Sequence, residues 1–569
     1  MATRPSNSGS SSPESYYTAS HSNVERGSTT ASSPGQNAPC PYREARQLQR
    51  ELKDHCQIFL EEQLYTCAIS LLNSTLGSGM SRRTPSSKPV LIPPPSHLAL
   101  LSTLAVHPLH TTRAENARLR EVSSVALSYL RRLLSVSGPV NAGFRTAFQF
   151  HSSPRRGRRP GLANAGSDSD ASDGDGEHGA RDRPRGRMAN QSSIWSRGQD
   201  LWMTVGWAFN TSALHPDRWR YWKVWLHFML DVLDADWAER ERQDEVAHET
   251  NGGEGDAPTA SRRESMIAMY MGLQDGAGQA AHKRIIKALL ADGSPLSSSS
   301  FPAVFEKELR GPRRTSKKRK RDQVLDLEND KYGDYLDDDS ISSGVSEPPT
   351  PPKPRGQRRK STLLGTSESG PAESVGLRLR FFQLISAATC ALGKEMEVCR
   401  LYEELALGIK GLRLDMFALH VTQKENPLPA EAHVSIIRDL FHLLLPPRYK
   451  DPRKVDPGGH AEARLTMRML EDCYVSWPAN TVALEDNAKL SLLVESAIQL
   501  LWLNDAIDYT ESFGAACETG IQSREAKARK RRTGKIRAES DDVVAQEILH
   551  SSGQRIRVLL DELKSTTPL

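Results

Sequence analysis

The fold is decided by the stretch Trp195–Trp237, WSRGQDLWMTVGWAFNTSALHPDRWRYWKVWLHFMLDVLDADW, which carries seven of the nine Trp residues. Trp195, Trp202 and Phe209 recur at seven-residue intervals, so we expect them on one face of one helix. Pro216 favours the start of a second helix, because its missing N–H would be unpaired in the first turn anyway. The stretch therefore predicts a helical hairpin.

Two apolar stripes run side by side along the second helix of this hairpin. The stripes contain Trp219, Trp222, Leu226, Met229, Leu233 and Trp237, and Tyr221, Trp225, Phe228 and Val232. A helix that is apolar on two faces packs on both sides, so the hairpin is expected at the centre of a core. We assign Trp202, Trp222 and Trp225 to that core rather than to an exposed aromatic cage or base-stacking surface. The interleaved Arg218, Arg220 and Lys223 are expected to cover the solvent side.

Composition sets limits on the rest of the chain. It has 569 residues, 75 Lys and Arg against 70 Asp and Glu, and 37 % hydrophobic residues, which is low enough that part of the chain should have no core. The seven Cys form no CxxC pair, so neither a disulfide framework nor a zinc ribbon is expected. The N-terminus lacks the apolar segment of a secretory signal, and no apolar run suggests a membrane span. A reducing compartment is the expected location.

The sequence divides into alternating polar and helix-patterned segments. These are a disordered tail at 1–41, a helical region at 42–150, a disordered basic and acidic linker at 151–191, the Trp-rich hairpin at 192–240, a mostly disordered insert at 241–375 and a helical region at 376–569. Helical spacing begins at Ala45, and Gly138-Pro139 is a stop signal for a long helix. Short helices are expected near Met266–Leu273 and Ile285–Leu290. The prediction is an all-α fold, an irregular α-solenoid-like array of helical hairpins interrupted by long disordered segments.

The first helix pair, Ala45–Asn73, resembles the helix–turn–helix unit of tetratricopeptide-type proteins. It lacks that family's Trp, Gly-Tyr and Pro positions, so the resemblance implies an α-solenoid scaffold and no particular binding residues. The alternation of helical regions with polar linkers resembles the linker-rich nuclear proteins of filamentous fungi.

Two basic clusters predict import into the nucleus. Their residues are Arg313, Arg314, Lys317, Lys318, Arg319, Lys320 and Arg321, and Lys530, Arg531 and Arg532. The first cluster resembles the import signal bound by importin-α, which implies importin-α as a partner and a nuclear location. The same charge could instead neutralise DNA phosphates without sequence specificity, so non-specific DNA binding remains open.

Kinase-type patterns are frequent in the polar segments. The candidate phosphorylation sites are Ser153, Ser167, Ser265, Ser316, Thr350 and Ser361. Ser153 and Thr350 resemble sites of proline-directed kinases, and Ser265, Ser316 and Ser361 lie in the Arg-Arg-x-Ser pattern of basophilic kinases. A phosphate beside the first basic cluster would cancel part of its charge and could regulate import.

No motif predicts catalysis. Gly174, Gly176 and Gly179 match the spacing of a dinucleotide fingerprint, but they lie in an acidic polar tract without the strand and helix that the motif requires. The sixteen His are scattered, and no P-loop, HExxH or GxSxG sequence occurs. We therefore expect no catalytic residue, metal, cofactor or small-molecule substrate. The predicted function is that of a non-enzymatic nuclear scaffold or adaptor subunit of a chromatin or cell-cycle assembly, with other nuclear proteins as partners. A chromatin protein that binds DNA through basic segments is the alternative.

Overall fold

The structure is a computed structural model that describes residues 41–80, 89–150, 182–250, 258–272, 278–311, 370–393, 395–422, 426–462, 464–529 and 540–566. Within these residues almost all regular structure is helical, and the exception is a two-stranded sheet formed by β1 (Ala45–Gln47) and β2 (Val90–Ile92). The predicted all-α fold class is confirmed.

The chain does not enter its first helix at Ala45, as the apolar spacing predicted. Ala45–Gln47 is a strand that pairs in parallel with Val90–Ile92, and Leu48 N donates to Ile92 O at 2.9 Å. Val90, Leu91 and Ile92 favour extended backbone, and the prolines that follow them cannot donate to a ladder. This partner lies 45 residues away in register, so a local helical period could not reveal it. The expected helix pair follows as α1 (Arg50–Glu61) and α2 (Tyr65–Met80).

The next group of helices comprises α3 (Pro95–Val106), the 3₁₀ helix η1 (Pro108–His110), α4 (Ala117–Asn141) and α5 (Phe144–Ala147). Helical geometry in α4 is interrupted at Gly138, which has a φ of 68°. A Cβ at this position would collide with the ring of Tyr42, so glycine is required by both backbone and space. The predicted stop at Gly138-Pro139 is therefore correct.

His97 in α3 is a buried polar side chain. Its side chain is inaccessible to solvent, and neither ring nitrogen has a hydrogen-bond partner among the described residues. Burial lowers the pKa of His97 to about 4, so the folded protein holds it neutral. Below its unfolded pKa of about 6.5 the unfolded chain binds a proton that the folded chain does not. At neutral pH His97 therefore costs the folded protein no stability by this route. The free energy of unfolding of the wild type decreases as the pH falls from about 6.5 towards 4.

We expect His97→Leu to keep or raise the melting temperature at pH 7, because it removes two unpaired buried nitrogens. At about pH 5 the free energy of unfolding of the variant should exceed that of the wild type by a further amount of about 1–2 kcal/mol. The reason is that each pH unit over which only the unfolded wild type is protonated costs the wild type about 1.4 kcal/mol. Melting curves of both proteins at the two pH values measure this gain. An equal difference between variant and wild type at both pH values would refute the assignment of His97 as a buried neutral group.

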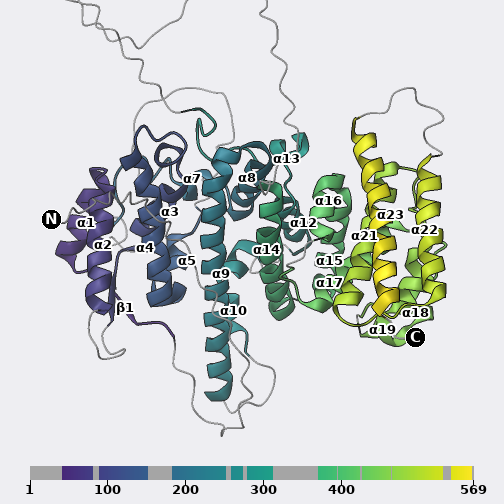
Figure 1. Ribbon diagram of the computed structural model, residues 1–569. Helices are drawn as coiled ribbons and strands as arrows, with labels where there is room; N and C mark the ends of the chain where they lie inside the picture. Colours follow the sequence, from purple (N-terminus) through teal and green to yellow (C-terminus); the bar gives the residue numbers. More distant parts are fainter. Residues whose placement is uncertain are drawn as a thin grey trace, which may run out of the picture. The chain divides into compact units, whose positions relative to one another are not determined.

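The Trp-rich stretch forms α7 (Ile194–Arg197), α8 (Leu201–Leu214) and α9 (Pro216–Thr250). The prediction that Trp195 shares a helix with Trp202 is wrong. The chain leaves helical geometry at Gly198, and the side chain of Asp200 accepts from Met203 N at 2.8 Å to cap α8. The second helix begins at Pro216, as predicted, and α9 lies between α3 and α4 on one side and α8 and α14 on the other (Figure 1).

α9 continues ten residues past the expected end of the hairpin at 240. Its polar C-terminal part is stabilised by side-chain pairs, among them Arg240 with Asp236 at 3.2 Å and Arg242 with Glu239 at 2.7 Å. Asp244 accepts hydrogen bonds from the backbone N–H groups of Ser261 and of its neighbour Arg262, which attaches the next helix to this part. Ion pairs at helical spacing therefore extend the helix beyond its apolar stripes.

Part of the predicted disordered insert is folded. It forms α10 (Ala260–Arg263), α11 (Met266–Met271), α12 (Gly278–Leu289) and α13 (Pro295–Ser300), two of which correspond to the short helices expected there. Met266, Ile285, Phe301 and Phe305 are buried. The apolar groups in this region are short and separated by polar residues, so only their packing against α8 and α9 shows that they belong to the core.

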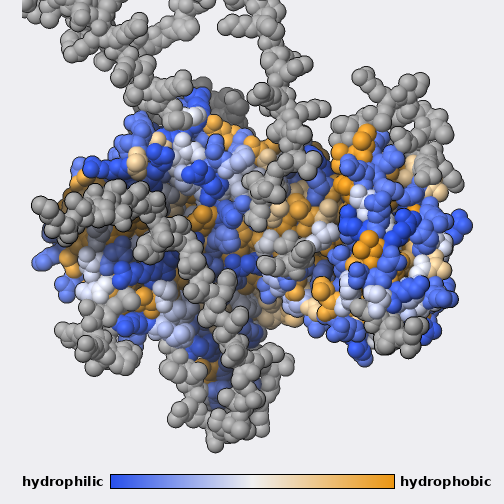
Figure 2. Space-filling model, in the orientation of Figure 1, coloured by the Kyte–Doolittle hydropathy of each residue, from blue (hydrophilic) through white to orange (hydrophobic). Residues whose placement is uncertain are grey.

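The C-terminal half consists of helices packed on their neighbours. They are α14 (Gly370–Leu392), α15 (Glu395–Gly411), α16 (Leu414–Val421), α17 (Ala430–Leu444), α18 (Pro452–Val455), α19 (Pro457–Ala461), α20 (Met467–Met469) with the π-helix η2 (Leu470–Val475), α21 (Leu484–Leu503), α22 (Glu511–Arg529) and α23 (Ser540–Thr566). α12 and α17 pack on α15, and α21 packs on α16, α17, α22 and α23. One cluster of buried apolar side chains runs from Leu48 to Leu563. On the face seen in Figure 2, hydrophilic residues cover much of α22 and α23.

α14 is long and apolar enough, by length and composition, to cross a bilayer, although the sequence analysis anticipated no such helix. More than half of its most apolar segment is buried, and it packs against α8, α9 and α16. Arg378 lies inside this packing, where its guanidinium stacks 4.1 Å from the centre of the Phe209 ring. In the structure α14 is a core helix of the array.

Candidate functional site

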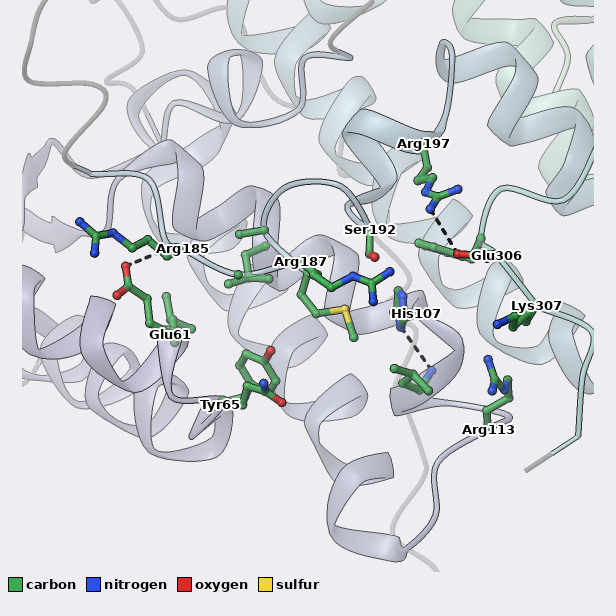
Figure 3. Close-up of a pocket in the computed structure, with 18 of the residues that line it drawn as sticks. Glu61, Tyr65, His107, Arg113, Arg185, Arg187, Ser192, Arg197, Glu306 and Lys307 are labelled. Carbon is green, nitrogen blue, oxygen red and sulfur yellow. Dashed lines mark hydrogen bonds and ion pairs between the residues drawn. The ribbon is translucent and has the colours of Figure 1, made fainter. Parts of the chain in front are cut away.

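A pocket of about 720 Å³ opens among four segments that are distant in sequence. They are the turn between α1 and α2, the residues around η1, the loop and short helix at 185–197, and the loop at 305–307. Five cationic side chains line it, Arg113, Arg185, Arg187, Arg197 and Lys307 (Figure 3). We call this feature the basic pocket.

Three carboxylates also line the basic pocket, and two of them are engaged. Glu61 accepts a hydrogen bond from the backbone N–H of Arg185 at 2.9 Å, and Glu306 lies 3.6 Å from Arg197. The third, Glu115, is exposed.

Four of the five pocket cations form no ion pair within the described part of the chain. They are Arg113, Arg185, Arg187 and Lys307, and Arg185 contacts Glu61 through its backbone N–H. Nε of Arg113 is buried and has no hydrogen-bond acceptor there. The pocket therefore holds positive charge that the described residues do not neutralise.

His107 forms part of the pocket wall, and the positive charge of the pocket affects its pKa. Its Nδ1 accepts from Leu109 N at 3.3 Å, and its ring meets Phe305 edge to face at 4.8 Å. Burial, together with electrostatic repulsion from His110, Arg218, Arg113 and Arg197, lowers the pKa of His107 to about 3. The imidazole is thus neutral at physiological pH and adds no charge to the pocket.

The loop at 305–307 is anchored by the buried carboxylate of Glu308. Arg218 donates to its Oε1 from Nε at 2.9 Å and from Nη2 at 2.7 Å, and Trp222 Nε1 donates to the same oxygen at 2.8 Å. Trp207 Nε1 and Phe305 N each donate to Oε2 at 3.1 Å. Five hydrogen bonds thus hold one carboxylate in the core.

Arg218 connects this anchor to a second wall of the pocket. Its Nη2 donates to Val106 O at 2.9 Å and its Nη1 to the hydroxyl of Thr111 at 2.6 Å, on either side of η1. Burial lowers the pKa of Arg218, while the Glu308 carboxylate acts in the opposite direction. The pair fixes the 305–307 loop and the η1 segment against α9, and so positions Lys307 and Arg113.

The expectation that Arg218, Arg220 and Lys223 cover the solvent side is wrong for Arg218, which is 2 % exposed. Arg220 is exposed, and Lys223 is partly buried in an ion pair with Glu373 at 3.0 Å. A signal for Arg218 was present, because it precedes Trp222 by four residues and so lies on the same buried face.

The Trp residues assigned to the core are buried, and their N–H groups are hydrogen-bonded. Trp202, Trp222 and Trp225 are at most 1 % exposed. Trp202 Nε1 donates to Tyr270 O at 2.8 Å, and Trp225 Nε1 donates to the hydroxyl of Ser102 at 3.1 Å. Neither an exposed cage nor a stacking surface is formed by these three rings.

Most of the other predicted site residues lie outside the described residues. These are Arg313, Arg314, Lys317–Arg321 and Lys530–Arg532 of the import clusters, the candidate phosphorylation sites Ser153, Ser167, Ser316, Thr350 and Ser361, and the glycines 174, 176 and 179. Ser265 is described, and its expected place in an accessible linker is wrong. It is fully buried, and its hydroxyl accepts from Ala268 N at 3.2 Å to cap α11, because the adjacent Met266 and Ile267 pack into the core.

The described residues contain no group of three His, Cys, Asp or Glu side chains placed to hold a metal ion. Fold and site together define an all-α array of packed helices with a basic pocket near its N-terminal end. No protein-family model, curated protein or solved structure matches the chain.

Proposed function

We propose that this chain is a non-enzymatic helical scaffold or adaptor subunit of a nuclear assembly that acts on chromatin or in the cell cycle. One continuous core extends through helices separated by long polar segments, an arrangement suited to presenting surfaces to several partners. The two basic clusters support the nuclear location. The candidate phosphorylation sites in the polar segments support regulation by kinases.

The observation that carries the non-enzymatic part of the proposal is the state of Glu308. It is a buried carboxylate directly after the 305–307 loop of the pocket, and five hydrogen bonds occupy its two oxygens. A general acid or base must exchange a proton with a ligand, whereas this carboxylate is fully engaged with Arg218, two Trp residues and Phe305. Its chemistry is used to build the fold.

The nuclear assignment predicts a change of location when the basic clusters are removed. Replacing Lys317–Arg321 and Lys530–Arg532 with Ala should move a fluorescent fusion of the full chain from the nucleus to the cytoplasm, because an import receptor binds successive cationic side chains. Microscopy of living cells measures the nuclear fraction. A matched control replaces the exposed Lys283 and Lys287 of α12 and should remain nuclear. Unchanged nuclear accumulation of the cluster variant would refute the assignment.

The alternative proposal, non-specific DNA binding, rests on the same clusters. The affinity of the purified chain for duplex DNA, measured at several salt concentrations, distinguishes DNA binding from a role in nuclear import alone. If the clusters bind phosphates, log K should fall linearly with log salt concentration, and the cluster variant should lose most of that slope. An import signal alone predicts no measurable DNA affinity for either protein.

A further inference from the structure

We propose that the basic pocket binds a phosphorylated serine or threonine side chain of a partner protein, held by Arg113, Arg187 and Lys307. This inference rests on the proposed scaffold function and assigns a site to it. The three cations come from three different segments that line one cavity, and in Figure 3 Arg187 lies on one side of His107 and Arg113 and Lys307 on the other. With Arg185, whose backbone N–H donates to Glu61, they are the pocket cations without an ion-pair partner among the described residues.

Phosphate fits these side chains better than a carboxylate does. A phosphomonoester carries about −1.5 to −2 charges and three acceptor oxygens, and guanidinium groups bind it with paired N–H donors. The buried Nε of Arg113 is a donor that has no acceptor among the described residues. A dianion placed here would satisfy this donor and balance most of the unpaired charge.

The size of the pocket and its apolar wall favour a peptide over a free phosphate ion. Its volume of about 720 Å³ far exceeds that of one phosphate and falls in the range of ordinary ligand pockets. Leu60, Tyr65, Leu109 and Met188 contribute apolar surface beside the cations, and Leu109 is 43 % exposed. Side chains that flank a phosphorylated residue could be buried against this wall.

The acidic residues of the pocket argue against a nucleic acid. A nucleic acid backbone carries successive phosphates and binds along a continuous cationic track. Here Glu61, Glu115 and Glu306 line the same pocket as the cations and would repel additional phosphates. The same carboxylates would attract basic residues beside the phosphorylated residue. We therefore infer a phosphopeptide that combines one phosphate with neighbouring basic or apolar side chains.

A peptide library with one fixed phosphoserine or phosphothreonine, screened on the purified full-length chain, tests the proposal. The sequences enriched by the chain are then synthesised with and without the phosphate, and their affinities are measured by fluorescence polarisation. We expect at least tenfold tighter binding of the phosphorylated form, since several charge-assisted hydrogen bonds depend on the phosphate. Equal affinity of the two forms, or no enrichment, would overturn the proposal.

Variants locate the binding site. Arg113→Gln combined with Arg187→Gln should weaken phosphopeptide binding at least tenfold, whereas Arg118→Gln combined with Arg120→Gln, two exposed changes on α4, should leave it unchanged. Lys307→Gln alone should weaken binding by a smaller factor, and a melting curve of each variant verifies its fold. Equal binding by the pocket and control variants would place the site elsewhere. Loss of single-stranded DNA binding in the pocket variant, without any phosphopeptide binding, would reassign the pocket to nucleic acid.

A negative result of the phosphopeptide experiment can be distinguished from a failure of the proposed function. It uses the purified chain and does not depend on import, so a cytoplasmic protein that binds phosphopeptides would refute only the nuclear assignment. A nuclear protein that binds no phosphopeptide would refute only the pocket assignment.

Discussion

Replacing Glu308 with Leu is expected to destabilise the protein by about 3–5 kcal/mol, because it leaves the guanidinium of Arg218 buried without a counter-charge. Both side chains of the pair are nearly inaccessible to solvent, so water cannot replace the lost carboxylate. The N–H groups of Trp207 and Trp222 lose their acceptor at the same time. Urea unfolding followed by Trp fluorescence should show the midpoint moving to a lower urea concentration.

A second variant tests whether the loss comes from the unpaired charge. Arg218→Met combined with Glu308→Leu should recover a large part of the stability, since apolar replacement of a whole buried pair is often close to neutral. The neighbouring Glu306→Leu is the control, because its side chain is 57 % exposed and its change should stay below about 0.5 kcal/mol. If the double variant is destabilised by the sum of the two single changes, the interpretation of the pair as one coupled unit is wrong.

Local patterns predicted those helices whose apolar residues repeat over several turns. The stripe from Trp219 to Trp237 repeats at helical spacing, and the structure buries it as the core-packing interpretation requires. The stop at Gly138 and the start at Pro216 each follow from the backbone properties of one residue. Such predictions succeed because the residues that determine the local structure lie within a few positions of it.

The parts that sequence analysis missed depend on partners far along the chain. Glu308 lies in a short polar run, and nothing within that run indicates that Arg218, 90 residues earlier, will bury it. β1 is a strand only because Val90–Ile92 pairs with it. In both cases the long-range contact outweighs the local preference of the sequence.

The basic pocket could not be read from the sequence for the same reason. Its cations Arg113, Arg187 and Lys307 lie on separate segments, so no local stretch of the sequence shows them together. Arg185 and Arg187 fall in the segment 151–191, for which the sequence predicts a disordered linker. The structure instead describes both residues as part of the pocket lining, and Arg185 N donates to Glu61 at the end of α1. The fold assembles this charge, whereas the import clusters carry theirs in consecutive residues.

Trp222→Ala is expected to destabilise the protein by about 3–5 kcal/mol, the usual cost of emptying a buried site of this size. The indole is fully buried and meets the rings of Trp225 at 5.5 Å and Phe305 at 6.0 Å. Its N–H also donates to Glu308, so the change removes packing and one bond of the buried anchor together. Since a domain has only about 5–15 kcal/mol in total, the melting temperature should fall markedly.

Trp222→Phe separates these two contributions. It keeps most of the aromatic volume and removes only the N–H donor, so we expect a smaller loss of about 1–3 kcal/mol. The exposed Val224→Ala on the same helix is the matched control and should melt close to the wild type, because its side chain is 37 % exposed. Near-wild-type melting of Trp222→Ala would contradict the core assignment. Because the Glu308 anchor positions the 305–307 loop, Trp222→Ala should also weaken phosphopeptide binding, whereas Val224→Ala should not.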